Sequence, residues 1–123
     1  MKYAIALIAF LMGGWLTFDG THAFVTGDYV TPKSGPNAGQ LGPWSRVIAT
    51  VGISPRGNSA KALHVILGCC WLAGLTAFVI RPSFGWYALA GSSVLSLWYL
   101  PIGTALSIVE LVLLFLPQIK STV

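Results

Sequence analysis

Long apolar stretches separated by short polar breaks run through most of the chain. The first covers 3–25 and carries only Asp19 and His22 as strongly polar interruptions. The second covers 60–80 and ends at an Arg-Pro-Ser turn. Each stretch holds about 20 residues, the length that a helix needs to cross the hydrocarbon core of a bilayer. The pattern therefore predicts two transmembrane helices, at 3–25 and at 60–80.

The apolar segment 84–117 is too long for one more helix. As a single helix it would reach about 50 Å, whereas the hydrocarbon core measures roughly 30 Å. Pro101 disfavours helix in the residue before it, and Gly103 permits a turn. We therefore expect two short helices, at 84–100 and at 101–117. A re-entrant hairpin that does not cross is the competing interpretation.

Together these segments predict an all-α integral membrane protein, a four-helix transmembrane bundle in one domain, 1–123, with a long polar loop at 26–59. A cleavable signal peptide is the alternative for the first segment, because Lys2 precedes the apolar run and Thr21-His22-Ala23 resembles a cleavage site. The run is long for a signal core, which favours a retained helix.

The polar loop 26–59 contains one amphipathic stretch. Its apolar residues recur at helical spacing, while Arg46 falls on another face, so we expect a short helix. The helix either lies in the membrane interface, with its tryptophan at headgroup level, or packs as a short turn beneath the loop. The apolar positions are Trp44, Val47, Ile48 and Val51.

Small residues recur along the predicted spans in stripes, a pattern that lets transmembrane helices approach closely. Aromatic pairs at 86–87 and 98–99 bracket the third span, as amphipathic rings do at the two water boundaries. The stripes comprise Ala9 and Gly13 in the first span, Cys70, Gly74 and Ala77 in the second, and Ala88, Ser92 and Ser96 in the third.

Composition agrees with lipid rather than water as the main solvent. Of the chain, 55% is hydrophobic and 8% is charged, against roughly 25% charged residues in soluble domains. The net charge of +4 comes from scattered cations, and without a basic run or face it does not indicate nucleic acid. Four cations on the loop side against three on the other leave the orientation open. The expected location is a bacterial cytoplasmic membrane.

Polar residues inside the predicted spans are the candidates for chemistry. If all spans share the same two ends, His64 lies about 6 Å below the loop-side face, Asp19 about 9 Å and Glu110 about 13 Å. His22 lies just outside Asp19, and Ser107 shares a helix face with Glu110. An ionised carboxylate at such a depth costs several kcal/mol unless it is paired, protonated or hydrated. We therefore expect one intramembrane polar cluster beneath the loop.

These residues do not form a recognisable catalytic or metal-binding motif. Hydrolytic triads, phosphate-binding glycine loops and dinucleotide fingerprints are missing, so we do not expect an enzyme. Asp19, His22 and His64 are acceptable metal-ligand types, but they come from separated segments and no metal site is predicted. The adjacent Cys69 and Cys70 lack the spacing of a redox or metal motif.

Two parts of the chain carry a family resemblance. Residues 27–45, with the runs Gly-Asp-Tyr-Val-Thr-Pro-Lys-Ser-Gly and Ala-Gly-Gln-Leu-Gly-Pro-Trp-Ser, and residues 97–104 resemble segments of small bacterial multi-pass membrane proteins. The resemblance implies a membrane protein of bacterial origin, and it implies no activity, cofactor or catalytic residue.

Three functions remain compatible with these features. The favoured one is a non-catalytic accessory or assembly subunit, which would contact lipid and either other membrane subunits or its own copies through its stripes and loop. The second is a homo-oligomeric, proton-coupled transporter in which Glu110 titrates. The third is a haem- or pigment-binding subunit that uses His22 or His64 as the ligand.

Overall fold

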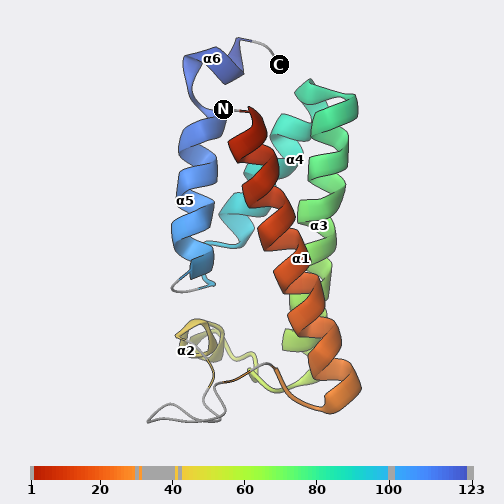
Figure 1. Cartoon of the computed structure of the whole chain (residues 1–123). Helices are drawn as coiled ribbons and strands as arrows, with labels where there is room; N and C mark the ends of the chain where they lie inside the picture. Colours follow the sequence, from red (N-terminus) through yellow and green to blue (C-terminus); the bar gives the residue numbers. More distant parts are fainter. Residues whose placement is uncertain (1, 30, 32–40, 42, 100–101, 122–123) are drawn as a thin grey trace.

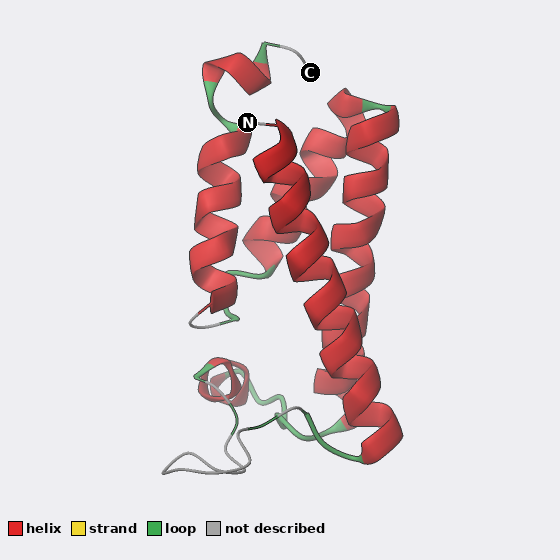
Figure 2. Ribbon diagram, viewed as in Figure 1, coloured by secondary structure: helices red, strands yellow, loops and turns green. Residues whose placement is uncertain are grey.

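All regular structure in the described part of the chain is helical. The computed structural model describes residues 2–29, 31, 41, 43–99 and 102–121, and these contain helices, turns and loops without a strand (Figure 2). The helices are α1 (Lys2–Thr26), α2 (Trp44–Thr50), α3 (Asn58–Ile80), α4 (Pro82–Leu95), α5 (Ile102–Leu114) and α6 (Pro117–Lys120).

The longest elements, α1 and α3, form an antiparallel pair that runs the height of the molecule (Figure 1). At 1.5 Å per residue they measure about 37 and 34 Å. Each is long and apolar enough to cross a membrane, and α5 is a shorter apolar helix. The helical stretches predicted at 3–25 and 60–80 therefore coincide with α1 and α3.

Glycines set the distance between α1 and α3. A Cβ atom added to Gly68 would lie 2.5 Å from the backbone nitrogen of Thr17, and one on Gly20 would lie 3.0 Å from the carbonyl oxygen of Lys61. The first separation is shorter than real Cβ contacts and the second is at their lower limit, so the two backbones lie in close contact where the glycines face the partner helix. Gly13, expected in a small-residue stripe, faces the same interface, where an added Cβ atom would lie 3.1 Å from the Gly68 carbonyl oxygen.

A tight hairpin joins α3 to α4. Only Arg81 separates the two helices, and the backbone nitrogen of Gly85 donates to its carbonyl oxygen at 2.9 Å. A Cβ atom on Gly85 would clash with the backbone of Phe78, so glycine permits this close return. Helix α4 begins at Pro82, which fits the first turn of a helix because proline lacks an N–H group.

Helices α4 and α5 are shorter than the ranges 84–100 and 101–117 predicted for them. After Leu95 the backbone changes to i→i−3 hydrogen bonds, such as Ser96 N to Ser93 O at 3.2 Å, which tighten the chain into turns. Leu116 is extended because it precedes Pro117, so α5 ends at Leu114 and α6 follows as a separate turn. The predicted breaker Pro101 lies outside the described residues.

The loop helix α2 occupies the space that the short helices leave. Figure 1 shows α2 below the α4–α5 turn and beside the ends of α1 and α3 that lead into the loop. Trp44 of α2 contacts Trp98 and Tyr99 of that turn, with ring centroids 6.0 and 5.8 Å away. Helix α2 therefore packs against the bundle from below.

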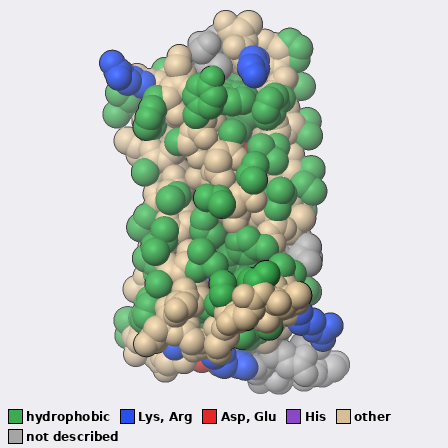
Figure 3. Space-filling model, turned by 180° about the vertical axis from the view of Figure 1, so that it is seen from behind, with side chains coloured by type: hydrophobic (Ala, Val, Ile, Leu, Met, Phe, Trp, Pro, Cys, Tyr) green, Lys and Arg blue, Asp and Glu red, His purple; other side chains and the backbone are tan. Residues whose placement is uncertain are grey.

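Large apolar side chains lie on the outside of the molecule as well as in its core. The sides of the molecule expose large apolar residues, for example Leu7, Ile66 and Val112. Figure 3 shows hydrophobic side chains over the flanks and Lys and Arg near the two ends. Several polar groups are buried instead. They are Asp19, Lys61, His64, Ser92, Ser93, Ser96, Ser107 and Glu110.

Candidate functional site

The imidazole ring of His64 lies at the centre of an aromatic cluster where the loop meets the bundle. Its centroid is 4.6 Å from Trp44, 4.8 Å from Tyr29, 5.4 Å from Tyr99 and 5.6 Å from Trp98. His64 has no exposed surface. We call these five residues, drawn from α3, α2, the loop and the α4–α5 turn, the His64 cluster.

The hydrogen bonds of His64 determine its tautomer. Nδ1 lies 2.8 Å from the carbonyl oxygen of Ala60, which can only accept, so Nδ1 carries a proton. Nε2 is buried without a hydrogen-bond partner among the described residues, and so is the hydroxyl of Tyr29. A second proton on Nε2 would place an unpaired cation in an aromatic interior, which is unfavourable. The ring is therefore neutral, with Nε2 as a free acceptor.

Asp19 joins the cluster through Tyr99. The Tyr99 hydroxyl accepts a 2.8 Å hydrogen bond from Trp15 Nε1 and is hydrogen-bonded to the side chain of Asp19. Because Trp15 and Asp19 are four residues apart in α1, both face the α4–α5 turn. Asp19 is only 3% exposed. This chain of contacts connects α1 to the turn and places a carboxylate near His64.

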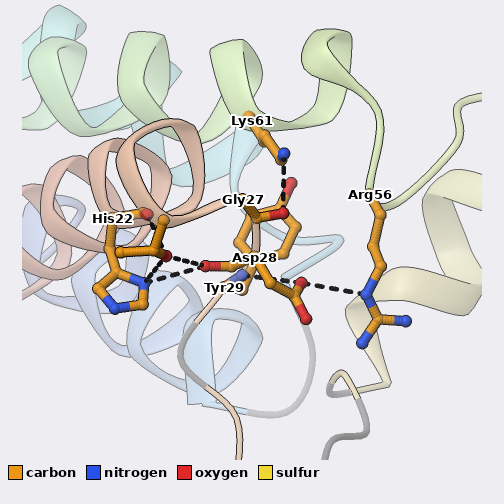
Figure 4. A network of polar contacts seen from close by, with 7 residues as sticks. His22, Gly27, Asp28, Tyr29, Arg56 and Lys61 are labelled. Atoms are coloured by element: carbon orange, nitrogen blue, oxygen red, sulfur yellow. Dashed lines mark hydrogen bonds and ion pairs between the residues drawn. The ribbon is translucent and has the colours of Figure 1, made fainter.

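A polar network closes the loop end of the molecule (Figure 4). Asp28 Oδ1 accepts hydrogen bonds from Arg56 Nε at 3.0 Å and from the Tyr29 backbone nitrogen at 2.9 Å. The carbonyl oxygen of Gly27 accepts from Lys61 Nζ at 3.2 Å. Gly27 has a φ of +95°, a backbone conformation that favours glycine. Its N–H donates a hydrogen bond to the Ala23 carbonyl oxygen and so caps the C-terminus of α1. The network holds the start of the loop against α3.

Charges in this network shift the acidity of its members. Burial alone would raise the pKa of Asp28, but the Arg56 hydrogen bond, the Tyr29 N–H and the charges of Arg56 and Lys61 lower it below the ordinary value of 3.8. Burial raises the pKa of the Tyr29 hydroxyl far above its usual value, with smaller contributions from Asp19 and Asp28. Asp28 is thus ionised and Tyr29 neutral near neutral pH.

His22 belongs to the loop network and not to the His64 cluster. Its Nδ1 lies 3.0 Å from the Asp28 carbonyl oxygen, to which it donates, and 3.3 Å from the Thr26 hydroxyl. Its ring also lies 5.9 Å from Phe18. Asp19 is buried near His64, whereas His22 stays partly exposed beside Asp28 (Figure 4).

Glu110 and Ser107 lie apart from the His64 cluster. Both are fully buried on α5, and neither side chain has a hydrogen-bond partner among the described residues. Tyr99, just before α5, contacts Trp15 near the middle of α1, so α5 runs beside the N-terminal half of α1 (Figure 1). The sequence placed Glu110 about 13 Å below the loop-side face by assuming that all helices end at the same level. Helices α4 and α5 stop short of that face, so the assumption fails for Glu110.

The amphipathic stretch of the loop forms the expected helix, α2, and one face of it is buried. Trp44 and Ile48 are buried in the aromatic cluster, Val47 is half-buried and Arg46 is exposed. Val51 is 72% exposed because α2 ends at Thr50 and a turn follows. Trp44 packs against four aromatic rings of the chain, so the helix is held against the bundle.

Several residues of the site were not expected from the sequence. Two of them contact the imidazole of His64, namely Tyr29 and Trp98. The third, Lys61, binds the carbonyl oxygen of Gly27 at the edge of the site. The sequence predicted Trp98 only as an aromatic residue at a membrane boundary. Tyr29 stands in the loop next to Asp28, and only the folding of the loop brings it to His64. Among the described residues, no three His, Cys, Asp or Glu side chains gather closely enough to hold a metal ion.

Comparison of the chain with protein-family models, with curated proteins and with solved structures finds no match. The function is therefore argued from the geometry of the chain itself.

Proposed function

We propose that the chain is an integral membrane protein whose four main helices cross or enter the bilayer. The distribution of polarity supports this proposal, since many large apolar side chains are exposed while Asp19, His64, Glu110 and several serines are buried. Water would make such a surface aggregate, whereas lipid makes it stable. Helices α4 and α5, at about 21 and 20 Å, are short for full spans, and local thinning of the bilayer would accommodate them.

Cys69 and Cys70 offer a direct test, since both are exposed near the middle of α3. In vesicles, a polar maleimide should fail to label them, and should label both after the membrane is dissolved in denaturing detergent. A matched control carries Ser54→Cys in the exposed loop with both native cysteines replaced by alanine, and it should be labelled readily from one side. Equal labelling of Cys69 and Ser54→Cys in intact vesicles would disprove the proposal.

Within the membrane, we infer a non-catalytic accessory or assembly role, with the folded loop as the docking element. The observation that carries this inference is the His64 cluster, which fixes α2 against the bundle and so gives the loop a defined outer face. Arg46 and Thr50 stand on that exposed face. A helix held in one position presents a surface to a partner without a large ordering cost.

The small-residue stripes contribute less to docking than the sequence indicates. Gly13 packs on α3, and Gly74 faces Ala88 and Leu89 of α4. These positions are used within the chain to bring its own helices together. The loop end is therefore the stronger candidate for contact with another subunit.

A photo-crosslinking amino acid tests the accessory role. Placed at Arg46, on the outer face of α2, it should give a specific adduct with a larger membrane protein in native membranes. Placed at Tyr87, exposed on α4 near the other end, it should not give that adduct. Purification in mild detergent solely as a monomer, with no adduct from either position, would argue strongly against this role.

A second candidate function, a proton-coupled carrier, rests on Glu110. Both of its carboxylate oxygens are buried without a partner among the described residues, an arrangement that a purely structural residue rarely keeps. Such a carboxyl group could exchange a proton during a transport cycle. Proton flux in vesicles that is equal for wild type and Glu110→Gln would remove this candidate.

We do not propose a haem or pigment site at His64. Ligation there would require Tyr29, Trp44, Trp98 and Tyr99 to leave the imidazole, and three of these rings also contact one another.

A further inference from the structure

Two hollows lie on either side of the α3–α4 turn, at the end of the molecule opposite the loop. One, of about 200 Å³, lies between the first turn of α1 and the last turn of α3 and is lined by Lys2, Tyr3, Ala6, Phe78, Val79 and Pro82. The other, of about 280 Å³, is lined by Ser83, Trp86, Tyr87 and Lys120. Each hollow therefore combines a lysine with aromatic or apolar walls.

The cations at this end are available to a ligand. Lys2, Arg81 and Lys120 are all exposed, whereas the chain's side-chain carboxylates lie elsewhere, with Glu110 enclosed within the bundle. At the loop end Arg46 is also exposed, but two other cations are engaged by the chain itself. There, Arg56 pairs with Asp28, and Lys61 is buried against the carbonyl oxygen of Gly27.

Aromatic rings hold the Lys120 ammonium group in position. Nζ lies 4.6 Å from the centroid of the Trp86 ring and 4.9 Å from that of Phe115. The indole N–H of Trp86 donates a 2.6 Å hydrogen bond to the Leu114 carbonyl oxygen, which fixes the ring. A cation over two rings keeps its N–H donors free for an anion in the adjoining hollow.

We propose that this end binds the headgroup of an anionic phospholipid. The phosphate would lie in the second hollow, between Lys120 and the Ser83 hydroxyl and beside the rings of Trp86 and Tyr87, with the exposed Arg81 adding positive charge at the same end. Charge complementarity favours an anionic lipid over a zwitterionic one, because each basic residue near the headgroups contributes separately to the attraction. This inference rests on the proposed membrane location and adds to it a lipid preference and a binding face.

The test is lipid retention by the full chain in mild detergent, measured by native mass spectrometry with equal amounts of phosphatidylglycerol and phosphatidylcholine. The wild type should retain phosphatidylglycerol preferentially. The pair Arg81→Gln with Lys120→Gln should reduce this preference about thirtyfold. The matched pair Lys33→Gln with Arg46→Gln removes two positive charges from the loop side, and it should keep the preference.

A further variant guards against misfolding of the double substitution. Ser83→Glu changes an exposed position and places a negative charge in the hollow, so it should also lose phosphatidylglycerol while its helical circular dichroism stays unchanged. Equal retention by all variants, or an equal loss in the loop-side pair, would overturn the lipid site alone. If the wild type fails to float with vesicles of either lipid, the membrane proposal fails together with it.

Discussion

The imidazole of His64, in the second turn of α3, packs 4.6 Å from the indole of Trp44, the first residue of α2. These residues are 20 positions apart, and the intervening chain leaves the bundle and returns between them. Their contact is edge to face, an arrangement that adds to the energy of burial alone. Together with the contacts of Trp44 to Trp98 and Tyr99, it attaches the loop helix to the bundle.

Replacing Trp44 with alanine should release the loop. The substitution removes a ring that is 6% exposed and contacts four aromatic neighbours, so we expect a loss of about 3–5 kcal/mol in the free energy of unfolding. Trypsin should then cut faster after Arg46 and Arg56. Val51→Ala, at a 72% exposed position beside the same helix, should leave both measurements nearly unchanged. Equal cleavage rates for the two variants would contradict the attachment.

The Asp28–Arg56 ion pair should make stability depend on acid. Because the pKa of Asp28 is lowered on folding, its stabilising effect is complete above about pH 4 and is lost as the pH falls through the folded-state pKa. The side chains of Arg56 and Asp28 are 51% and 44% exposed, so the effect stays below about 1 kcal/mol. Melting temperatures at neutral and acidic pH should fall less for Asp28→Asn than for wild type. An identical acid-induced fall in both would refute the prediction.

Gly68 and Gly14 should respond in opposite ways to alanine. A Cβ atom on Gly68 would meet the Thr17 backbone at 2.5 Å, whereas one on Gly14 would have nothing within 4 Å. Gly68→Ala should therefore push α1 and α3 apart and destabilise the protein by about 1–3 kcal/mol. Gly14→Ala should stabilise it by up to about 1 kcal/mol, because alanine favours helix. Thermal unfolding in detergent measures both, and a neutral Gly68→Ala would show that the helices do not touch there.

Glu110 should be replaceable by leucine with a gain in stability. The change removes two buried oxygens that lack partners among the described residues, and we expect the free energy of unfolding to rise by about 1–3 kcal/mol. Asp19→Val serves as the contrast. It leaves the Tyr99 hydroxyl without its carboxylate partner, and it should destabilise the protein by a similar amount. A large destabilisation by Glu110→Leu would indicate that the carboxyl group has a partner in the folded protein.

Much of the helical architecture follows from the order of apolar and polar residues. Helix α1 matches the predicted 3–25, α3 matches 60–80, and a tight turn lies at the predicted Arg81–Ser83 hairpin. These features are local, because the length of an apolar run and the position of a proline decide them without distant contacts. The lengths of α4 and α5 were harder to predict. The i→i−3 turns that follow Leu95 occur in an apolar segment whose sequence does not distinguish them from a continuing helix.

The grouping of polar residues depended on tertiary structure. Counting depth along each helix assumes that all helices end at the same level, and this assumption placed His64, Asp19 and Glu110 together. In the folded chain, α2 fills the space below the α4–α5 turn and α5 begins near the middle of α1. His64 and Asp19 therefore share a site with Tyr29 and Tyr99, while Glu110 lies in the other half.

The sequence by itself determined that the chain forms apolar helices joined by a long polar loop, because helix length, hydropathy and turn residues are properties of neighbouring positions. Only the tertiary structure decided how residues of the loop pack against the bundle. Side chains as distant as Tyr29, Trp44 and Tyr99 enclose His64 because their shapes fit together around it, and complementarity of shape cannot be counted from spacing along the chain.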